Sequence, residues 1–220
     1  IIRFLLIPFV PLYAFVVKFR NFLFDKEIFK KESVNAKIIS VGNITVGGSG
    51  KTPLVIFLAN MLNDAGARVG VLSRGYGRKS KGYMLVSDGK KIFADVEACG
   101  DEILLTAQEC SVACAVSERR IEGAKRLIAD QNVEVIVLDD AFQHRWIKRD
   151  IDLVVCEQKF LISPEFFDHY LLPAGLMRET FSALRRADAI IINRKFSQPR
   201  TIPDKVKRYF DNKPLFTSYY

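Results

Sequence analysis

The stretch of sequence that decides the fold is Val41-Gly42-Asn43-Ile44-Thr45-Val46-Gly47-Gly48-Ser49-Gly50-Lys51-Thr52-Pro53. It follows a short apolar segment, Lys37–Val41, which we expect to be a strand. It precedes Pro53–Asn63, which we expect to be a helix because proline is common in a first helical turn. Glycines let successive backbone N–H groups turn toward an anion, and a helix N-terminus adds positive charge. The pattern predicts a phosphate-binding loop (P-loop) made of Gly47, Gly48, Ser49, Gly50, Lys51 and Thr52.

The last two residues of this loop carry the side chains that bind nucleotide phosphates. We expect Lys51 to reach the terminal phosphates of ATP and the Thr52 hydroxyl to hold Mg²⁺. The strict P-loop pattern would place a glycine at position 45, where this chain has Thr45. The glycines at 47 and 48, with a strand before and a helix after, still favour ATP binding over a glycine-rich turn that only caps a helix.

A second motif supplies the carboxylate that a P-loop site needs. The apolar run Val135–Leu138 is followed directly by Asp139 and Asp140. A carboxylate at the end of such a strand is typical of the metal site in P-loop enzymes. We therefore expect Asp139 to bind Mg²⁺ directly or through water, and Asp140 to share the metal or to orient a neighbour. Both are candidate catalytic residues, together with Lys51.

Strand-like and helix-like segments alternate along the rest of the chain. We expect strands at residues 68–72, 112–116, 133–138, 152–156, 189–192 and 215–218, and helices at 101–109, 119–130, 181–186 and 204–210. Tyr83–Val86 and Lys91–Phe93 flank an Asp-Gly pair, which predicts a small β-hairpin insertion. This alternation indicates an α/β fold of the P-loop NTPase type, with a mostly parallel sheet flanked by helices. We assign residues 36–220 to that domain.

Residues 1–35 have a different composition and are predicted to be a separate membrane-associating segment. Phe4–Val17 contains no charge but includes Pro8 and Pro11, and it is shorter than the ~20 apolar residues that cross a bilayer. Phenylalanines then alternate with basic residues, namely Lys18, Arg20, Lys26, Lys30 and Lys31. This pattern favours a helical segment lying in the interface of an anionic membrane. A buried helix pair, a signal peptide and a true membrane span are the alternatives.

Composition and charge exclude several classes of protein. The chain is 49% hydrophobic and 26% charged, which excludes a disordered tail, a collagen and a disulfide-rich miniprotein. The formal net charge of +8 suits phosphates, nucleic acid or an anionic membrane. The sequence has no zinc knuckle, helix-turn-helix pairing or RRM motif, so we expect no nucleic-acid partner. The four cysteines are too few and too widely spaced for a disulfide framework, so we expect reduced core residues of a cytosolic protein.

Six sequence blocks resemble one known family, the tetraacyldisaccharide 4'-kinases (lipid A 4'-kinases) of Gram-negative bacteria. In this chain the blocks are residues 41–53, 73–78, 100–102, 138–144, 171–175 and 185–188. The resemblance implies transfer of the γ-phosphate of ATP to the 4'-hydroxyl of a tetraacylated glucosamine disaccharide 1-phosphate. It also implies a location at the cytoplasmic face of the inner membrane, and members that continue well beyond residue 220. We therefore expect this chain to be a fragment.

The resemblance also implies roles for individual residues. Asp101 corresponds to the catalytic carboxylate of the family and would be the general base, although an N-cap of the helix at 101–109 is the alternative from sequence alone. Glu102 is then a candidate metal-shell residue. The anionic sugar-phosphate end of the lipid would be bound by Arg74, Tyr76, Arg78, Arg120, Gln143 and His144, with Arg119 as an equal alternative to Arg120.

One other function remains open at the level of sequence. A membrane-recruited P-loop ATPase of the partitioning or metal-insertion type would share the loop and the apolar N-terminus, and in it Asp101 would only cap a helix. The kinase is the preferred hypothesis, with ATP and Mg²⁺ as cofactors and no obligate protein partner evident. The segment Gly75-Tyr76-Gly77-Arg78-Lys79-Ser80 begins like a dinucleotide fingerprint, but it lacks the third glycine and is excluded as one.

Overall fold

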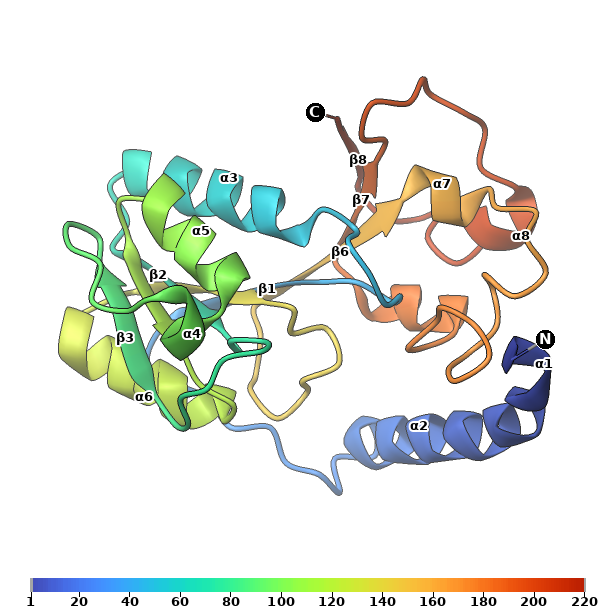
Figure 1. Cartoon of the computed structure of the whole chain (residues 1–220), viewed down its shortest axis with the longest axis horizontal. Coiled ribbons are helices and arrows are strands. Elements are labelled where there is room, and N and C mark those ends of the chain that lie inside the picture. The colour runs from blue at the N-terminus through green and yellow to red at the C-terminus, as the bar shows by residue number, and fades with distance from the viewer. Residues whose placement is uncertain (1, 220) are drawn as a thin grey trace. The chain divides into compact units, whose positions relative to one another are not determined.

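The computed structural model describes residues 2–219 (Figure 1). The chain forms two compact units. The central unit contains Lys31–Val41 and Lys51–Ile151, and the terminal unit contains the residues up to Lys30, Gly42–Gly50 and the residues from Asp152 onward. The glycine-rich stretch before Lys51 therefore belongs to the terminal unit, and Lys51 itself begins a helix of the central unit. The boundary predicted between residues 35 and 36 stays a prediction.

The strands of the central unit are β1 (Lys37–Gly42), β2 (Val69–Ser73), β3 (Met84–Asp88), β4 (Ala113–Val116) and β5 (Val135–Asp139). Their order is β3-β4-β2-β5-β1, and every neighbouring pair is parallel except β3 and β4. β2 and β4 are buried along their whole length. Continuous apolar strands of this kind form when helices cover both faces of a parallel sheet.

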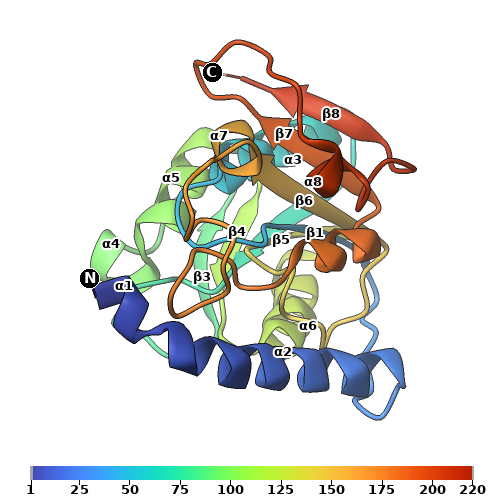
Figure 2. The same cartoon turned by 90° about the vertical axis from the view of Figure 1, so that its right-hand side faces the viewer.

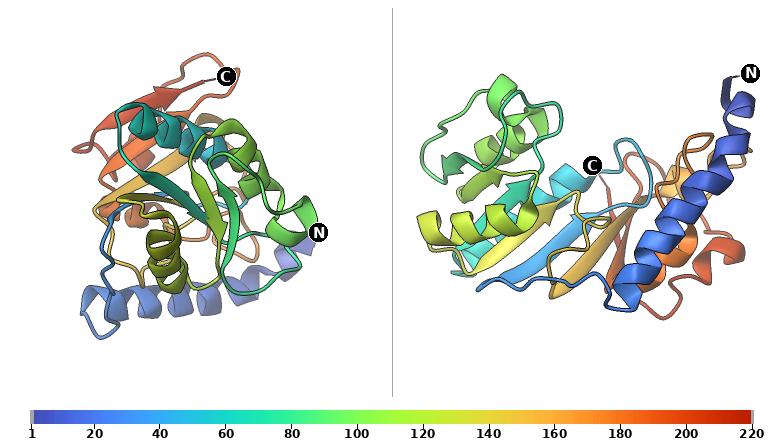
Figure 3. Two further views of the ribbon diagram at one scale, coloured as in Figure 1. Left: turned by 90° about the vertical axis from the view of Figure 1, so that its left-hand side faces the viewer. Right: turned by 90° about the horizontal axis from the view of Figure 1, so that it is seen from below.

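Helices cover both faces of this sheet. Helices α3 (Lys51–Asp64) and α5 (Asp101–Glu109) lie on one face and α6 (Arg120–Gln131) lies on the other (Figures 1 and 3). Leu72 and Ile136 of the sheet pack with Leu127 of α6 in a cluster whose members are almost fully buried. The α/β architecture predicted from the alternation of segments is confirmed.

The predicted β-hairpin is only partly correct. The first arm is β3, but its ladder partner is β4. The second arm contributes one bridge, between Ser87 and Ile92. The turn forms as expected, because the Asp88 carboxylate accepts hydrogen bonds from the backbone N–H groups of Lys90 and Lys91. A four-residue helix that the sequence analysis missed, α4 (Val96–Cys99), follows and leads into α5.

The terminal unit contains three parallel strands among its described residues. They are β6 (Ile151–Glu157), β7 (Ala189–Asn193) and β8 (Leu215–Ser218), side by side in Figure 2. The connections hold α7 (Gln158–Leu161), the 3₁₀ helix η2 (Phe181–Arg186) and α8 (Asp204–Lys207). The helix expected at residues 204–210 is thus shorter than predicted, whereas η2 and β8 have the predicted bounds.

The N-terminal segment is helical in α1 (Ile2–Leu5), η1 (Ile7–Phe9) and α2 (Val10–Asp25). Figure 2 shows α2 running beside the segment that leads to η2. The Tyr13 hydroxyl donates to the Arg178 carbonyl oxygen, and the Asn21 amide donates to the Glu179 carboxylate. Together the helical run Arg3–Asp25 has 23 residues, enough by length and composition to cross a membrane. It includes Lys18, Arg20 and Asp25, so its uncharged part is still Phe4–Val17. None of its most apolar window is buried, which argues against a core helix pair.

Candidate active site

The centre of the candidate site is the carboxyl-terminal edge of the central sheet. Asp139 is the last residue of β5, and it pairs in register with Val41 at the end of β1. Ser73 ends β2, the neighbour of β5 on the other side, and its hydroxyl lies 3.2 Å from Asp139 Oδ2. Open parallel sheets bind their ligands outside this edge. The predicted carboxylate is therefore at the place where such a fold binds its ligands.

Asp139 is a buried acid among other charged groups. Burial raises its pKa to about 6, and the negative charges of Glu102 and Asp140 add to this effect. The positive charges of Lys51 and Arg120 act in the opposite direction. Charged side chains of both signs therefore act on Asp139 at this edge of the sheet.

Lys51 joins this group from the first turn of α3. Its side chain is largely buried, and its Nζ lies 3.5 Å from Asp140 Oδ1. Burying an ammonium group is costly unless a carboxylate compensates it, and Asp140 provides that compensation. The structure thus brings together Lys51, Asp139 and Asp140, three of the residues predicted from the sequence, and the charge of a fourth, Glu102, acts on Asp139.

The carboxylate of Asp139 fits a divalent cation. Its Oδ1 is buried and has no hydrogen-bond partner among the described residues, and such an oxygen is normally satisfied by an ion or a water. Residues 2–219 contain no cluster of three or more His, Cys, Asp or Glu side chains arranged to hold a metal. Mg²⁺ is usually bound by one or two carboxylates together with phosphate oxygens, so a single carboxylate is sufficient here.

The glycine turn Gly47–Gly50 is held by side chains of the terminal unit. The Asn43 amide donates to Ser49 Oγ, and the Asn193 amide, at the end of β7, donates to the Ser49 carbonyl oxygen, both at 2.9 Å. Gly47 and Gly50 have positive φ angles. A Cβ added at Gly47 or Gly48 would meet no described atom within 4 Å. The turn is therefore anchored by hydrogen bonds on one side and borders open space at Gly47 and Gly48. A loop that binds phosphate needs such open space.

Asp101 is the first residue of α5 and is exposed. Gly100 occupies the N-cap position, with φ +92° and no side-chain cap, so the structure does not support the alternative that Asp101 is only the N-cap. The Asp101 carboxylate accepts a hydrogen bond from the N–H of Glu102. An exposed carboxylate at a helix N-terminus can accept a proton from a ligand, so the general-base prediction stays open and is proposed again below.

The four predicted cationic and aromatic ligands of the lipid fall into two kinds. Arg74 and Tyr76 are exposed on the loop after β2. The Arg78 side chain is only 3% exposed and is paired with Glu118. Arg120 is also buried and donates to the carbonyl oxygens of Ser117 and Asp139. Burial lowers the pKa of Arg120 to about 10, the negative charges of Asp139 and Asp140 oppose this, and the positive charges of Arg74 and Arg78 add to it.

A cavity of about 560 Å³ lies in the central unit next to these arginines. Its lining includes Glu118, Arg119, Arg120, Arg126, His144 and Trp146. The predicted ligand His144 therefore faces the same space as Arg120. Gln143 precedes it in the turn after β5 and is partly buried.

Sequence reasoning missed the residues that hold these loops. Asn43 and Asn193 anchor the glycine turn, and Ser73 contacts Asp139. Asn43 lies inside the motif of residues 41–53, six residues before Ser49, so the sequence could have indicated its role in holding the turn. Asn193 is 144 residues away from Ser49, and no local pattern links the two.

Comparison with known proteins places the chain in a family. The family model described as tetraacyldisaccharide-1-P 4'-kinase matches residues 2–218. A tetraacyldisaccharide 4'-kinase from Chlorobaculum parvum is 42% identical over 98% of this chain and 60% of its own length. One from Aquifex aeolicus is 39% identical over 97% of this chain and 64% of its own length.

A solved structure agrees with these sequence relatives. It is the "apo" form of LpxK from Aquifex aeolicus in complex with ATP, with a TM-score of 0.87 and 39% identity over 99% of this chain and 64% of that one. The chain thus spans a little under two thirds of the length of these relatives. It belongs to the tetraacyldisaccharide-1-P 4'-kinase family.

Proposed function

We propose that this chain contains the catalytic core of an ATP-dependent tetraacyldisaccharide 4'-kinase. The reaction would transfer the γ-phosphate of ATP to the 4'-hydroxyl of a tetraacylated glucosamine disaccharide 1-phosphate. The observation that supports this most strongly is the buried Lys51, which directly follows the glycine turn and lies 3.5 Å from Asp140, beside Asp139. The family match over residues 2–218 supplies the identity of the acceptor.

The nucleotide would be held by the glycine turn and the residues that follow it in the chain. Backbone N–H groups of Gly47–Gly50 would surround the phosphates, and the Lys51 ammonium would bind a terminal phosphate oxygen. Thr52 and Asp139 would hold Mg²⁺, with Glu102 in its outer shell. The bound metal neutralises charge on the β- and γ-phosphates. Lys51 would then exchange its contact with Asp140 for one with phosphate.

The acceptor hydroxyl needs a base, and we assign that role to Asp101. Its carboxylate would take the proton of the 4'-hydroxyl while the oxygen forms its bond to the γ-phosphorus and the bond to the β-phosphate oxygen breaks. Asp101 suits this role because it is exposed at the start of α5, in a unit that also carries Lys51 and Asp139. Asp140 would orient Lys51 before the nucleotide binds.

The head group of the acceptor is an anion, and exposed cationic residues suit it. We propose that Arg74 and Tyr76, with Gln143 and His144, contact the sugar-phosphate end. Arg78 and Arg120 are engaged within the protein, so we assign them to support this surface rather than to touch the lipid. This revises the sequence-based roles of those two arginines.

The acyl chains require an apolar surface, which the N-terminal helices offer. Exposed apolar side chains there are Phe4, Leu5, Phe9, Leu12, Phe15, Val16, Phe19 and Phe22. With Lys18 and Arg20 beside them, we propose peripheral or monotopic binding to an anionic membrane, at the cytoplasmic face of the inner membrane. In a flotation assay with anionic vesicles, a Phe15→Ser/Phe19→Ser variant should lose binding, whereas Phe57→Ser on α3 should not. Unchanged binding of the double variant would contradict this role.

The kinase is tested by the lipid dependence of ATP turnover in the full-length protein. Turnover should require the tetraacyl disaccharide 1-phosphate, and Lys51→Ala and Asp101→Ala should each lower it by at least about 10²-fold. Lys51→Ala should also weaken ATP binding, whereas Asp101→Ala should leave it unchanged. Substantial lipid-independent hydrolysis would favour the P-loop ATPase instead. A near-normal rate for Asp101→Ala would falsify the base assignment.

A further inference from the structure

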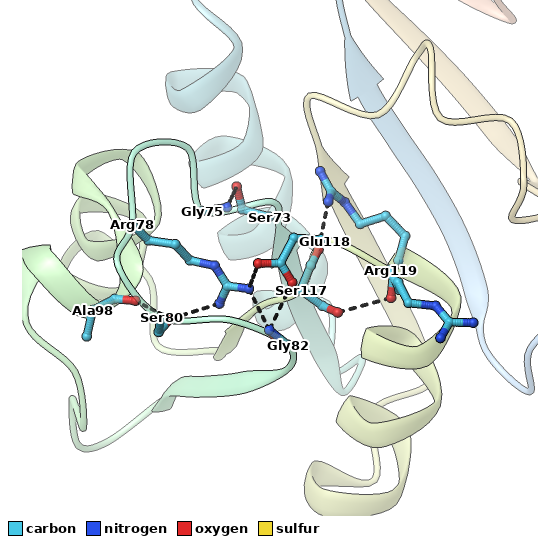
Figure 4. A network of polar contacts seen from close by, with 10 residues as sticks. Ser73, Gly75, Arg78, Ser80, Gly82, Ala98, Ser117, Glu118 and Arg119 are labelled. Carbon is cyan, nitrogen blue, oxygen red and sulfur yellow. Dashed lines mark hydrogen bonds and ion pairs between the residues drawn. The ribbon is translucent and has the colours of Figure 1, made fainter.

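Residues 74–82, in the loop between β2 and β3, are held together by the Arg78 guanidinium, as Figure 4 shows. Nη2 of Arg78 donates to Glu118 Oε1 at 2.6 Å and to the Gly82 carbonyl oxygen, and Nη1 donates to Ser80 Oγ at 3.2 Å. One buried side chain thus binds its own loop at two points and a second loop at Glu118. We call residues 74–82 the arginine loop.

Glu118 completes this connection from the turn between β4 and α6. Its second carboxylate oxygen, Oε2, accepts a hydrogen bond from the Gly82 N–H at 3.0 Å. Burial acts to raise the pKa of Glu118, but the hydrogen bonds from Arg78 and from backbone N–H groups, together with the positive charge of Arg78, outweigh it, and the pKa is lowered overall. Both carboxylate oxygens therefore serve to hold the far end of the arginine loop.

The other side of the arginine loop lies directly on the junction of α4 and α5. The Lys79 N–H donates to the Glu97 carbonyl oxygen at 2.7 Å, and Ser80 Oγ donates to the Ala98 carbonyl oxygen. The approach is so close that a Cβ on Gly100 would lie 2.8 Å from the Tyr76 carbonyl oxygen. Asp101 follows Gly100, so the backbone that carries the proposed base rests on the arginine loop.

We infer that Arg78 and Glu118 are a positioning pair, which fixes the arginine loop between the α4–α5 junction and the β4–α6 turn. The pair would thereby set the relative positions of Arg74, Tyr76 and Asp101, the acceptor-facing residues. This inference rests on the proposed kinase function. Arg78 acts through position and not by touching the acceptor, because its side chain is only 3% exposed.

The test uses the full-length protein with substitutions at Arg78. Arg78→Met should lower kcat/KM for the lipid acceptor roughly tenfold, because small displacements of positioned groups have large effects on rate. It should leave the Kd for ATP within about twofold, since the arginine loop is not assigned to ATP. Arg78→Lys, which keeps a donor at this place, should recover part of the loss. The matched control is Lys79→Met, on the same loop, whose ion pair with Glu97 is exposed on both sides and contributes little.

Hydrogen exchange provides a readout that needs no catalysis. In Arg78→Met the backbone amides of Lys79 and Gly82 should exchange faster, while those of α3 should not change. Equal losses of ATP affinity and acceptor kcat/KM would overturn the inference, and so would faster loop exchange with unchanged acceptor kinetics. If the unsubstituted protein transfers no phosphate to the lipid, the proposed function fails. Exchange at Lys79 and Gly82 then still decides whether Arg78 holds the loop.

Discussion

Two glycine-containing loops in this molecule follow the ends of parallel strands, and they are built in opposite ways. The glycine turn after β1 is anchored from outside by Asn43 and Asn193, and it borders open space at Gly47 and Gly48. The arginine loop after β2 is filled by its own Arg78, and a Cβ added at Gly75 would lie 2.8 Å from the Cys99 carbonyl oxygen.

The difference shows how to recognise a ligand loop from its surroundings. Glycine and basic residues occur in both loops, so composition does not separate them. In the glycine turn the side-chain hydrogen bonds go to Ser49, whose own N–H donates to the Gly47 carbonyl oxygen, and the N–H groups of Gly48 and Gly50 beside it are the ones we expect to bind a phosphate. In the arginine loop the Arg78 guanidinium already donates hydrogen bonds to Glu118 and to the carbonyl oxygen of Gly82.

The largest effects are expected when an alanine is placed in each loop. Gly75→Ala should lower the melting temperature by about 5 °C or more, because φ is +70° and the added Cβ meets the Cys99 carbonyl and Arg78. Gly48→Ala should leave the melting temperature within about 1 °C, because its Cβ meets no described atom. It should nevertheless weaken ATP binding, because the methyl group would stand in the open space that we propose the phosphates fill. Thermal unfolding and ATP titration of both variants measure these effects. A clear loss of thermal stability in Gly48→Ala would show that Gly48 packs against other parts of the protein, and it would contradict the open space described at this position.

A smaller effect is expected when the anchor of the glycine turn is removed. Asn193→Ala deletes the hydrogen bond to the Ser49 carbonyl oxygen, and ATP affinity should fall about five- to tenfold, the value of roughly one buried hydrogen bond. Asn60→Ala removes a similar amide-to-carbonyl bond, from α3 to Glu109, at an exposed position and serves as the control. Equal ATP affinities of the two variants would show that the anchor does not shape the turn.

The smallest effect concerns the buried acid at the end of β5. The folded pKa of Asp139, about 6, lies above its ordinary value of 3.8, so its stabilising contribution is complete below pH 4 and is lost as the pH rises through 6. Asp139→Asn is neutral at every pH. In metal-free buffer it should therefore raise the melting temperature by about 3 °C at pH 8, with no gain near pH 4. A gain that does not depend on pH would contradict the burial of a charged carboxylate here.

Most of the fold could be predicted from the sequence because its signals are local. The bounds of α5 and β8 agree with prediction, and β2, β4, β5, β6 and β7 differ from it by one or two residues. The errors are in segments whose secondary structure depends on tertiary contacts or that are very short. The ladder partner of β3 is β4, from a distant part of the chain, and the second arm of the hairpin forms one bridge. Helix α4 has four residues, too few for a periodic pattern. All four cysteines are buried and have free thiols, as predicted.

The candidate site was predictable where the chemistry itself defines a motif. Lys51, Asp139 and Asp140 come together as expected because a strand end and a helix start meet at one sheet edge. The arginines were not predictable to the same degree. Arg78 and Arg120 were predicted to bind the lipid head group, but their partners are Glu118, 40 residues from Arg78, and the carbonyl oxygen of Asp139. No local sequence pattern distinguishes an arginine that is paired within the protein from one that can bind a ligand.

The most direct test of the account is transfer of ³²P from γ-labelled ATP to the tetraacyl disaccharide 1-phosphate by the full-length protein, with Asp101→Ala in parallel. The account predicts label at the 4'-position of the lipid with the unsubstituted protein and at least about 10²-fold less with the variant. The contradicting result would be label released only as free phosphate, at a rate that is the same with and without the lipid and is unchanged by Asp101→Ala.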